Sequence, residues 1–64
     1  MSKTIREAVV GDKFKCVNGN GWGFWKEGDF LIVTELWLPE GVDLNGKPAA
    51  TLFAQDFEFV EGDN

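Results

Sequence analysis

The chain has 64 residues, of which 44% are hydrophobic and 14% aromatic, a composition that indicates one globular domain and excludes a disordered chain. Eleven acidic residues against six basic ones give a net charge of −5, which argues against general nucleic-acid binding because phosphates attract clustered Lys and Arg. With one cysteine and no histidine, neither an internal disulfide nor a zinc site is expected.

The start of the chain and its apolar runs bear on location. No uncharged run approaches the roughly 20 residues of a membrane span, and Met1-Ser2-Lys3 leads directly into polar sequence. We therefore predict a cytoplasmic monomer without a signal peptide that does not enter a membrane. Residues 1–64 are expected to form a single domain, with a barrel over about residues 9–60 and frayed ends at 1–4 and 61–64.

The segment 4–10 is the one helix candidate. Thr4 and Glu7 have the spacing of a capping box, but seven residues are few for a helix. A strand and a single turn before Gly11 both remain open. The next segment, residues 12–17, alternates as a half-buried strand does, with Phe14 and Cys16 on the inner face.

Residues 18–28 are expected to form a long loop or irregular hairpin, because they include four glycines and two asparagines. The segment 29–38 is the strongest strand candidate. It has apolar residues on both faces, which predicts a central strand or one that bends between two sheets. One face carries Phe30, Ile32, Thr34, Leu36 and Leu38, and the other carries Leu31, Val33, Glu35 and Trp37.

The second half of the chain is divided by turn signals. Pro39-Glu40-Gly41 ends the long strand, and Asn45-Gly46 is typical of a hairpin turn. We expect strands at Val42–Leu44, with residues 41–46 open between strand and turn, at Pro48–Ala54 and at residues 57–60. The expected core consists of large apolar side chains: Phe14, Trp25, Phe30, Ile32, Leu36, Leu52, Phe57 and Phe59.

Short strands separated by regular turn signals predict an all-β domain, and two segments resemble the Src-homology-3 fold. The run Trp25-Lys26-Glu27-Gly28-Asp29-Phe30-Leu31-Ile32-Val33 is similar to its diverging turn, and Asp56-Phe57-Glu58-Phe59-Val60 is similar to its last strand. In that fold the last strand follows one tight helical turn, which corresponds here to Ala54-Gln55-Asp56. The resemblance implies a single small five-stranded Src-homology-3-like barrel.

The peptide recognition of that family is not implied for this chain. The family binds proline-rich peptides with Tyr residues and with a Pro near the last turn, and this chain has no Tyr and no Pro near Ala54. In style, a small acidic chain rich in Gly, Phe and Trp also resembles the accessory proteins of tailed bacteriophages. That resemblance implies a bacterial host protein as the partner and the host cytoplasm as the location.

The residues for catalysis are missing or poorly placed. Without His, the commonest acid–base group is absent, and Cys16 is expected to be a buried, unreactive thiol. Alternation places Asp56 and Glu58 on one solvent face, and Asp43 lacks the other ligands of a calcium loop. We therefore expect no catalytic residue, no cofactor and no metal site.

Three large aromatics, Trp22, Phe24 and Trp25, stand close together in the Gly-rich loop. Either all three rings cover the core, or at least one faces solvent as an anchor, since Trp is enriched at binding hot spots. The diverging-turn resemblance implies that Trp25 points inward. We predict a non-enzymatic protein-interaction module that binds a protein partner through this loop. The expected binding residues are Trp22, Phe24, Lys26, Glu27 and Asp29.

The alternative function is that of a nucleic-acid-associated small β-barrel that stacks bases on the loop aromatics beside Lys13, Lys15 and Lys26. Such a platform needs a positive groove, and the scattered basic residues make nucleic acid the less favoured partner. A basic strip beside the rings would favour nucleic acid, and an acidic or neutral rim would favour a protein.

Overall fold

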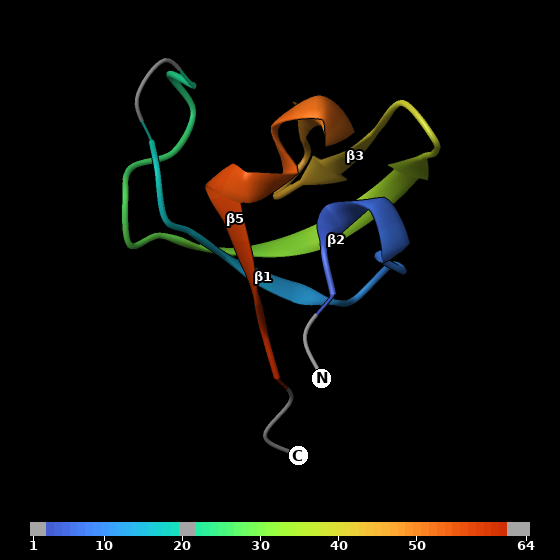
Figure 1. Ribbon diagram of the computed structural model, residues 1–64, viewed down its shortest axis with the longest axis horizontal. Coiled ribbons are helices and arrows are strands. Elements are labelled where there is room, and N and C mark those ends of the chain that lie inside the picture. Colours follow the sequence, from blue (N-terminus) through green and yellow to red (C-terminus); the bar gives the residue numbers. More distant parts are fainter. Residues whose placement is uncertain (1–2, 20–21, 62–64) are drawn as a thin grey trace.

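Five antiparallel strands form one sheet, accompanied by two short 3₁₀ segments (Figure 1). The computed structural model describes residues 3–19 and 22–61. In chain order the elements are η1 (Ile5–Glu7), β1 (Lys13–Cys16), β2 (Phe30–Trp37), β3 (Gly41–Leu44), β4 (Lys47–Ala50), η2 (Thr51–Asp56) and β5 (Phe57–Val60). The strands lie in the order β4-β3-β2-β1-β5, which confirms the all-β prediction.

Strand β2 is the central strand and joins two halves of the sheet. Its first residues pair with β1, and its later residues pair with β3. The register shifts between Val33 and Glu35, as it does where a β-bulge inserts an extra residue. Thr34 lies at this shift, where its Oγ1 accepts a hydrogen bond from the Gly46 N–H at 3.0 Å and donates one to the Asp43 carbonyl at 3.3 Å. The side chain of Thr34 therefore ties the irregularity to the β3–β4 hairpin.

The register shift decides which residues of β2 face the core. Before it, Leu31 and Val33 are buried, whereas after it Leu36 packs against the core. The prediction that Phe30 and Ile32 belong to the core is wrong, because they lie on the outer face, 56% and 40% exposed. Unbroken alternation put residues 30, 32 and 36 on one face, and the shift separates them.

The core lies between the inner face of the sheet and the segments that cover it. The predicted core residues Phe14, Trp25 and Phe57 are buried, and Leu36 and Phe59 pack against them. The N-terminal segment contributes Ile5 and Ala8, which were not among the predicted core residues. The buried apolar residues are Ile5, Ala8, Phe14, Cys16, Trp25, Leu31, Val33, Val42, Leu44, Ala49, Ala54 and Phe57.

The β3–β4 hairpin has the predicted two-residue turn. Asn45 and Gly46 both have positive φ, 53° and 81°, as a type I′ turn requires. The predicted strand over residues 48–54 is wrong beyond Ala50, because η2 begins at Thr51. Thr51 Oγ1 donates to the Pro39 carbonyl at 2.7 Å, and the Thr51 N–H donates to the Glu40 carbonyl at 3.0 Å. These bonds hold the chain as it leaves the strand.

Each short helical segment has both buried and exposed residues. Leu52, predicted in the core, lies on η2 and is 71% exposed, so that prediction is wrong. Ala54 of the same segment is buried instead. None of the helical segments in the described part of the chain is long and apolar enough to span a membrane.

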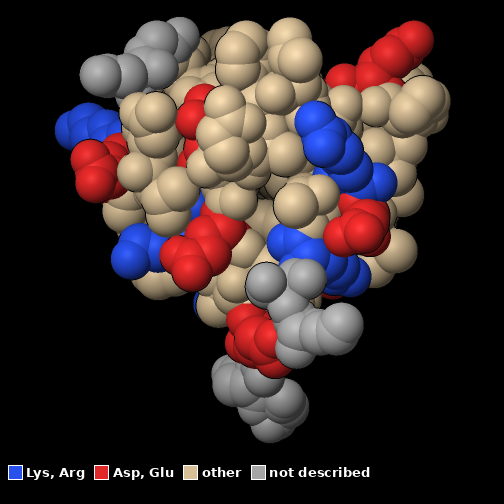
Figure 2. All heavy atoms as spheres, in the orientation of Figure 1, with Lys and Arg blue, Asp and Glu red and all other residues tan. Residues whose placement is uncertain are grey.

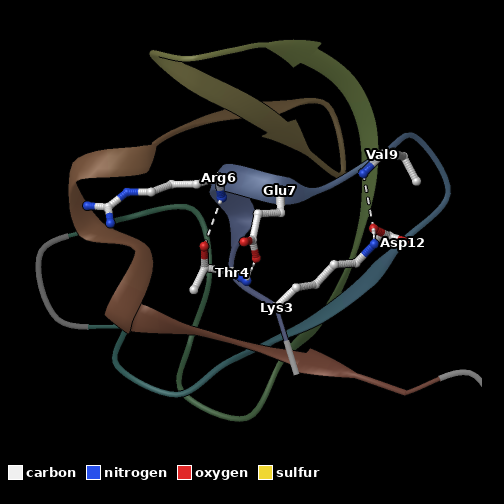
Figure 3. A network of polar contacts seen from close by, with 6 residues as sticks. All are labelled: Lys3, Thr4, Arg6, Glu7, Val9 and Asp12. Atoms are coloured by element: carbon white, nitrogen blue, oxygen red, sulfur yellow. Dashed lines mark hydrogen bonds and ion pairs between the residues drawn. The ribbon is translucent and has the colours of Figure 1, made fainter. Parts of the chain in front are cut away.

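Polar contacts hold the N-terminal segment against the start of β1 (Figure 3). Thr4 and Glu7 form the predicted capping box around η1, which settles residues 4–10 as a single turn rather than a strand. Lys3 Nζ lies 2.7 Å from Asp12 Oδ2, and the same carboxylate accepts the Val9 N–H at 3.0 Å. Burial raises the pKa of Asp12, but the bonds from Lys3 and Val9 and the Lys3 charge outweigh it, so this pKa lies below its ordinary value.

Candidate functional site

The loop between β1 and β2 is closed at its base by backbone hydrogen bonds. The Cys16 N–H donates to the Asp29 carbonyl at 2.8 Å, and the Gly28 N–H donates to the Cys16 carbonyl at 2.6 Å. Gly28 has a φ of +97°, which favours glycine. A Cβ on Gly19 would lie 2.8 Å from the Glu27 nitrogen, so the two arms of the loop are in close contact. The loop therefore holds its aromatic side chains at defined positions.

The three loop aromatics take three different environments. Trp25 is buried in the core, as the diverging-turn resemblance implied. Trp22 is partly buried and packs against the core, whereas Phe24 is 51% exposed. The loop thus covers part of the core with one ring while it presents another to solvent. The alternative in which all three rings cover the core is therefore wrong, because Phe24 faces solvent as the other alternative required of at least one ring.

One hydrogen bond and three contacts with aromatic rings hold the Trp22 side chain in place. Its indole Nε1–H donates to Asp56 Oδ2 at 2.8 Å, and its ring centroid lies 5.2 Å from Trp25, 5.3 Å from Phe57 and 5.6 Å from Phe53. The expectation that Asp56 faces solvent is wrong, because it is 8% exposed and accepts this bond. Trp22 therefore has a set orientation with one side left accessible.

The other predicted binding residues lie on the loop or at its end, and no single pocket in the described part of the chain is lined by all of them. Lys47 Nζ, from the start of β4, lies 5.5 Å from the Phe24 ring centroid, a cation–π distance. Lys26, Glu27 and Asp29 are all exposed. Asp29 Oδ2 accepts the Lys26 N–H at 2.9 Å, so that carboxylate also stabilises the turn before β2.

A shallow apolar groove adjoins Trp22. It has a volume of about 400 Å³ and extends from Trp22 to Trp37, the exposed last residue of β2. Its lining residues come from the loop, the end of β2 and the β3–β4 hairpin: Trp22, Trp37, Glu40, Gly41, Val42, Pro48, Ala49 and Ala50. Of the five predicted binding residues, Trp22 is the one that lines this groove.

Three exposed apolar residues near Trp22 were not among the predicted binding residues. Trp37 is 56% exposed, and Leu52 and Phe53 on η2 are 71% and 43% exposed. Figure 2 shows an uncharged area at the top of the molecule, on the side of η2, with charged side chains beside it and below it. The sequence contained a signal for Trp37. The predicted strand ends at Pro39, two residues later, and a side chain at the end of a strand has few neighbours that can bury it.

The one thiol is not exposed at this surface. Cys16 is fully buried on β1, and burial together with the charges of Asp29, Asp56 and Glu27 raises its pKa, so it stays protonated at neutral pH. A protonated buried thiol is not a nucleophile. Within residues 3–19 and 22–61, no group of three or more His, Cys, Asp or Glu side chains is placed to hold a metal ion.

Searches of protein-family models, of curated proteins and of solved structures give no match for this chain.

Proposed function

We propose that the protein is a non-enzymatic interaction module that binds a protein partner through the loop aromatics and the groove beside them. The observation that carries the proposal is the apolar groove of about 400 Å³ between Trp22 and Trp37. Protein interfaces obtain most of their binding energy from a few aromatic anchors in such hollows. Because Trp22 is held by Asp56, its ring loses little rotational freedom when a partner binds.

The order of features along the chain supports a Src-homology-3-like architecture as part of this proposal. A long loop closed by a turn at Gly28 precedes β2, a hairpin with Gly46 joins β3 to β4, and η2 leads directly into β5. These are the features that the resemblance implied, in the same order. We also propose a phage origin, with a bacterial host protein as the partner. For this reason the test uses a bacterial lysate.

A second candidate function rests on a different face of the sheet. Phe30 is 56% exposed on the outer face of β2, with Lys13 Nζ 5.4 Å from its ring centroid and Lys15 paired beside it. An exposed aromatic next to lysines is the element that single-stranded nucleic-acid binders use for stacking. Glu58 pairs with Lys15 on the other side, which reduces the positive charge of this face. Nucleic-acid binding is therefore the weaker candidate.

Affinity capture from a bacterial lysate, with and without nuclease, tests both candidates. Phe24→Ala and Phe30→Ala are matched variants, because each removes one half-exposed Phe ring, the first from the loop and the second from the outer face of the sheet. We expect Phe24→Ala and Trp37→Ala to lose the captured protein, with Phe30→Ala and nuclease treatment having no effect. Melting curves of the three variants check that each is folded.

Two outcomes would contradict the proposed function. If nuclease and Phe30→Ala abolish capture while Phe24→Ala does not, the second candidate replaces the first. If a protein is captured equally by all three variants, the loop and groove are not its binding surface.

A further inference from the structure

The outer face of the sheet half formed by the end of β2, β3 and β4 has a distinct chemistry. Two rows of paired residues cross it. Trp37, Gly41 and Ala50 form one row, and Glu35, Asp43 and Pro48 form the next. Their chain neighbours Val42, Leu44 and Ala49 are buried, so the residues of both rows point away from the core. An apolar row that includes an exposed Trp therefore lies beside a row that includes two carboxylates.

Glu35 and Asp43 are directly opposite each other on neighbouring strands. Like charges in this position repel and destabilise the sheet. Glu40, which lines the groove itself, adds a third carboxylate at the same end of the molecule. The face thus keeps a concentration of negative charge at a cost to its own stability.

The basic side chains of the described residues do not neutralise this face. Lys3 is paired with Asp12, Lys13 lies over Phe30, and Lys47 lies over Phe24. No ion pair joins a described Lys or Arg to Glu35, Glu40 or Asp43. These carboxylates can therefore pair with a cation that another molecule brings.

We propose that this outer face, which adjoins the groove at Trp37, binds an arginine-bearing segment of the protein partner, with the guanidinium group over the Trp37 ring and near the Glu35 and Asp43 carboxylates. This inference rests on the proposed function and specifies the chemistry of its partner. A guanidinium group stacks on indole and forms paired hydrogen bonds with a carboxylate. Trp37 and Glu35 are two residues apart on one strand, about 7 Å along the same face, which one side chain can span.

The charge of the molecule favours this occupant over two others. Nucleic acid would bring phosphates against three carboxylates. A second copy of the chain would bring another net charge of −5, which opposes association. A basic segment is attracted both by the local carboxylates and by the whole molecule.

The test is an NMR titration of the full ¹⁵N-labelled chain with acetyl-tetra-arginine amide. The neutral citrulline analogue, which has nearly the same shape, is the matched probe. We expect the arginine peptide to move the Trp37 indole N–H signal in a saturable, salt-sensitive way, and to leave the signal of the buried Trp25 in place. The citrulline peptide should bind at least tenfold more weakly.

Two matched variants separate local recognition from overall charge. Glu35→Gln and Glu58→Gln make the same substitution at exposed positions within strands and change the net charge equally, but Glu58 lies opposite Lys15 rather than opposite Asp43. We expect Glu35→Gln to weaken arginine-peptide binding severalfold and Glu58→Gln to change it less than twofold. Glu35→Gln should also raise the melting temperature, because it removes the repulsion with Asp43.

The inference is overturned if both peptides move the Trp37 indole N–H signal equally, or if Glu35→Gln and Glu58→Gln weaken arginine-peptide binding equally. It is also overturned if the signals of the groove residues change with protein concentration alone, because that would indicate a second copy of the chain. Its failure is distinct from failure of the proposed function. A lysate protein whose capture needs Phe24 and Trp37 but is unaffected by Glu35→Gln and Asp43→Asn leaves the interaction module standing and removes the arginine-bearing partner.

Discussion

The two halves of the sheet have similar inner faces and different outer faces. In the half formed by β5, β1 and the start of β2, the outer face carries Phe30 and Ile32 beside Lys13 and Lys15. In the half formed by the end of β2, β3 and β4, it carries Trp37 and Pro48 beside Glu35 and Asp43. The first outer face thus combines apolar side chains with two lysines and Glu58, whereas the second combines them with carboxylates, and the two are joined at the register shift in β2.

The difference shows what the register shift contributes. With unbroken alternation, Phe30 and Ile32 would share a face with Leu36, and one half would turn its apolar side chains outward. The shift at Thr34 allows Leu31 and Val33 to point inward in one half and Leu36 to point inward in the other. Each half of the sheet can therefore have different side chains on its outer face while its inner face still buries apolar residues.

The largest expected effect tests the inner face against the outer face within one half. Phe14→Ala removes a fully buried ring, which typically costs about 3–5 kcal/mol and is comparable with the whole stability of so small a domain. Phe30→Ala removes the same ring from the outer face. We expect Phe14→Ala to be largely unfolded by circular dichroism at room temperature, and Phe30→Ala to melt close to the wild type.

If Phe30→Ala unfolds the protein as Phe14→Ala does, Phe30 belongs to the core. The alternation first inferred for β2 would then hold, and the two-faced description of the sheet would fail.

A smaller effect is expected where Trp22 connects the two halves. Its ring contacts Phe57 of β5 and lines the groove with residues of β3 and β4. Trp22→Phe keeps an aromatic ring but removes the N–H that Asp56 accepts, which leaves a buried carboxylate without this donor. We expect a loss of about 1–3 kcal/mol in the free energy of unfolding, measured by chemical denaturation.

Trp37→Phe is the matched control for that variant, because it makes the same substitution at a ring that is 56% exposed. Equal stability of the two variants would mean that Trp22 is only a surface side chain and that the halves are joined by β2 alone.

The sequence allowed local features to be predicted better than features that depend on distant contacts. The capping box of Thr4, the Asn45-Gly46 turn and the inward Phe14 each follow from neighbouring residues, and each is present. The faces of β2 did not, because both alternating sets contain apolar residues and the shift lies where Thr34 bonds to Gly46, a residue of the β3–β4 turn. The end of β4 was also misplaced, since Thr51 bonds to Pro39 and Glu40, far from it in sequence.

For the candidate site, too, features set by nearby residues were predicted and features set by distant contacts were not. The buried position of Trp25 followed from the diverging-turn resemblance, and the structure agrees. The groove combines Trp22 with Trp37 and the β3–β4 hairpin, which are brought together only by the fold. Asp56 was misplaced on the solvent face because its partner, Trp22, is 34 residues away.

The join between the halves is expected to contribute about 1 kcal/mol through Thr34. Thr34→Val keeps the branched shape but removes the hydroxyl that accepts the Gly46 N–H and donates to the Asp43 carbonyl. We expect a correspondingly lower free energy of unfolding and faster hydrogen exchange at the Gly46 amide. Ile32→Val, an outer-face change just before the shift, should leave Gly46 exchange unaffected. Unchanged exchange in Thr34→Val would show that the shift does not depend on this side chain.

The smallest expected effect depends on pH and concerns Asp12, which precedes β1 and whose carbonyl accepts the Val33 N–H just before the shift. The folded protein lowers the pKa of Asp12 from 3.8, so the unfolded chain takes up the proton at a higher pH than the folded chain. Stability from this carboxylate is therefore fully present above about pH 3.8 and is lost as the pH falls through the lower folded pKa. Because the contacts of Asp12 lie near the surface, we expect Asp12→Asn to cost about 0.5–1 kcal/mol at neutral pH. Unfolding free energies measured from neutral pH to about pH 2 should show that the cost of Asp12→Asn shrinks below pH 3.8. Lys3→Gln should cause part of the same loss of stability at neutral pH, since Lys3 supplies one of the two hydrogen bonds to Asp12 Oδ2. A difference between wild type and Asp12→Asn that stays constant down to pH 2 would mean that the carboxylate charge does not hold the N-terminal segment to β1.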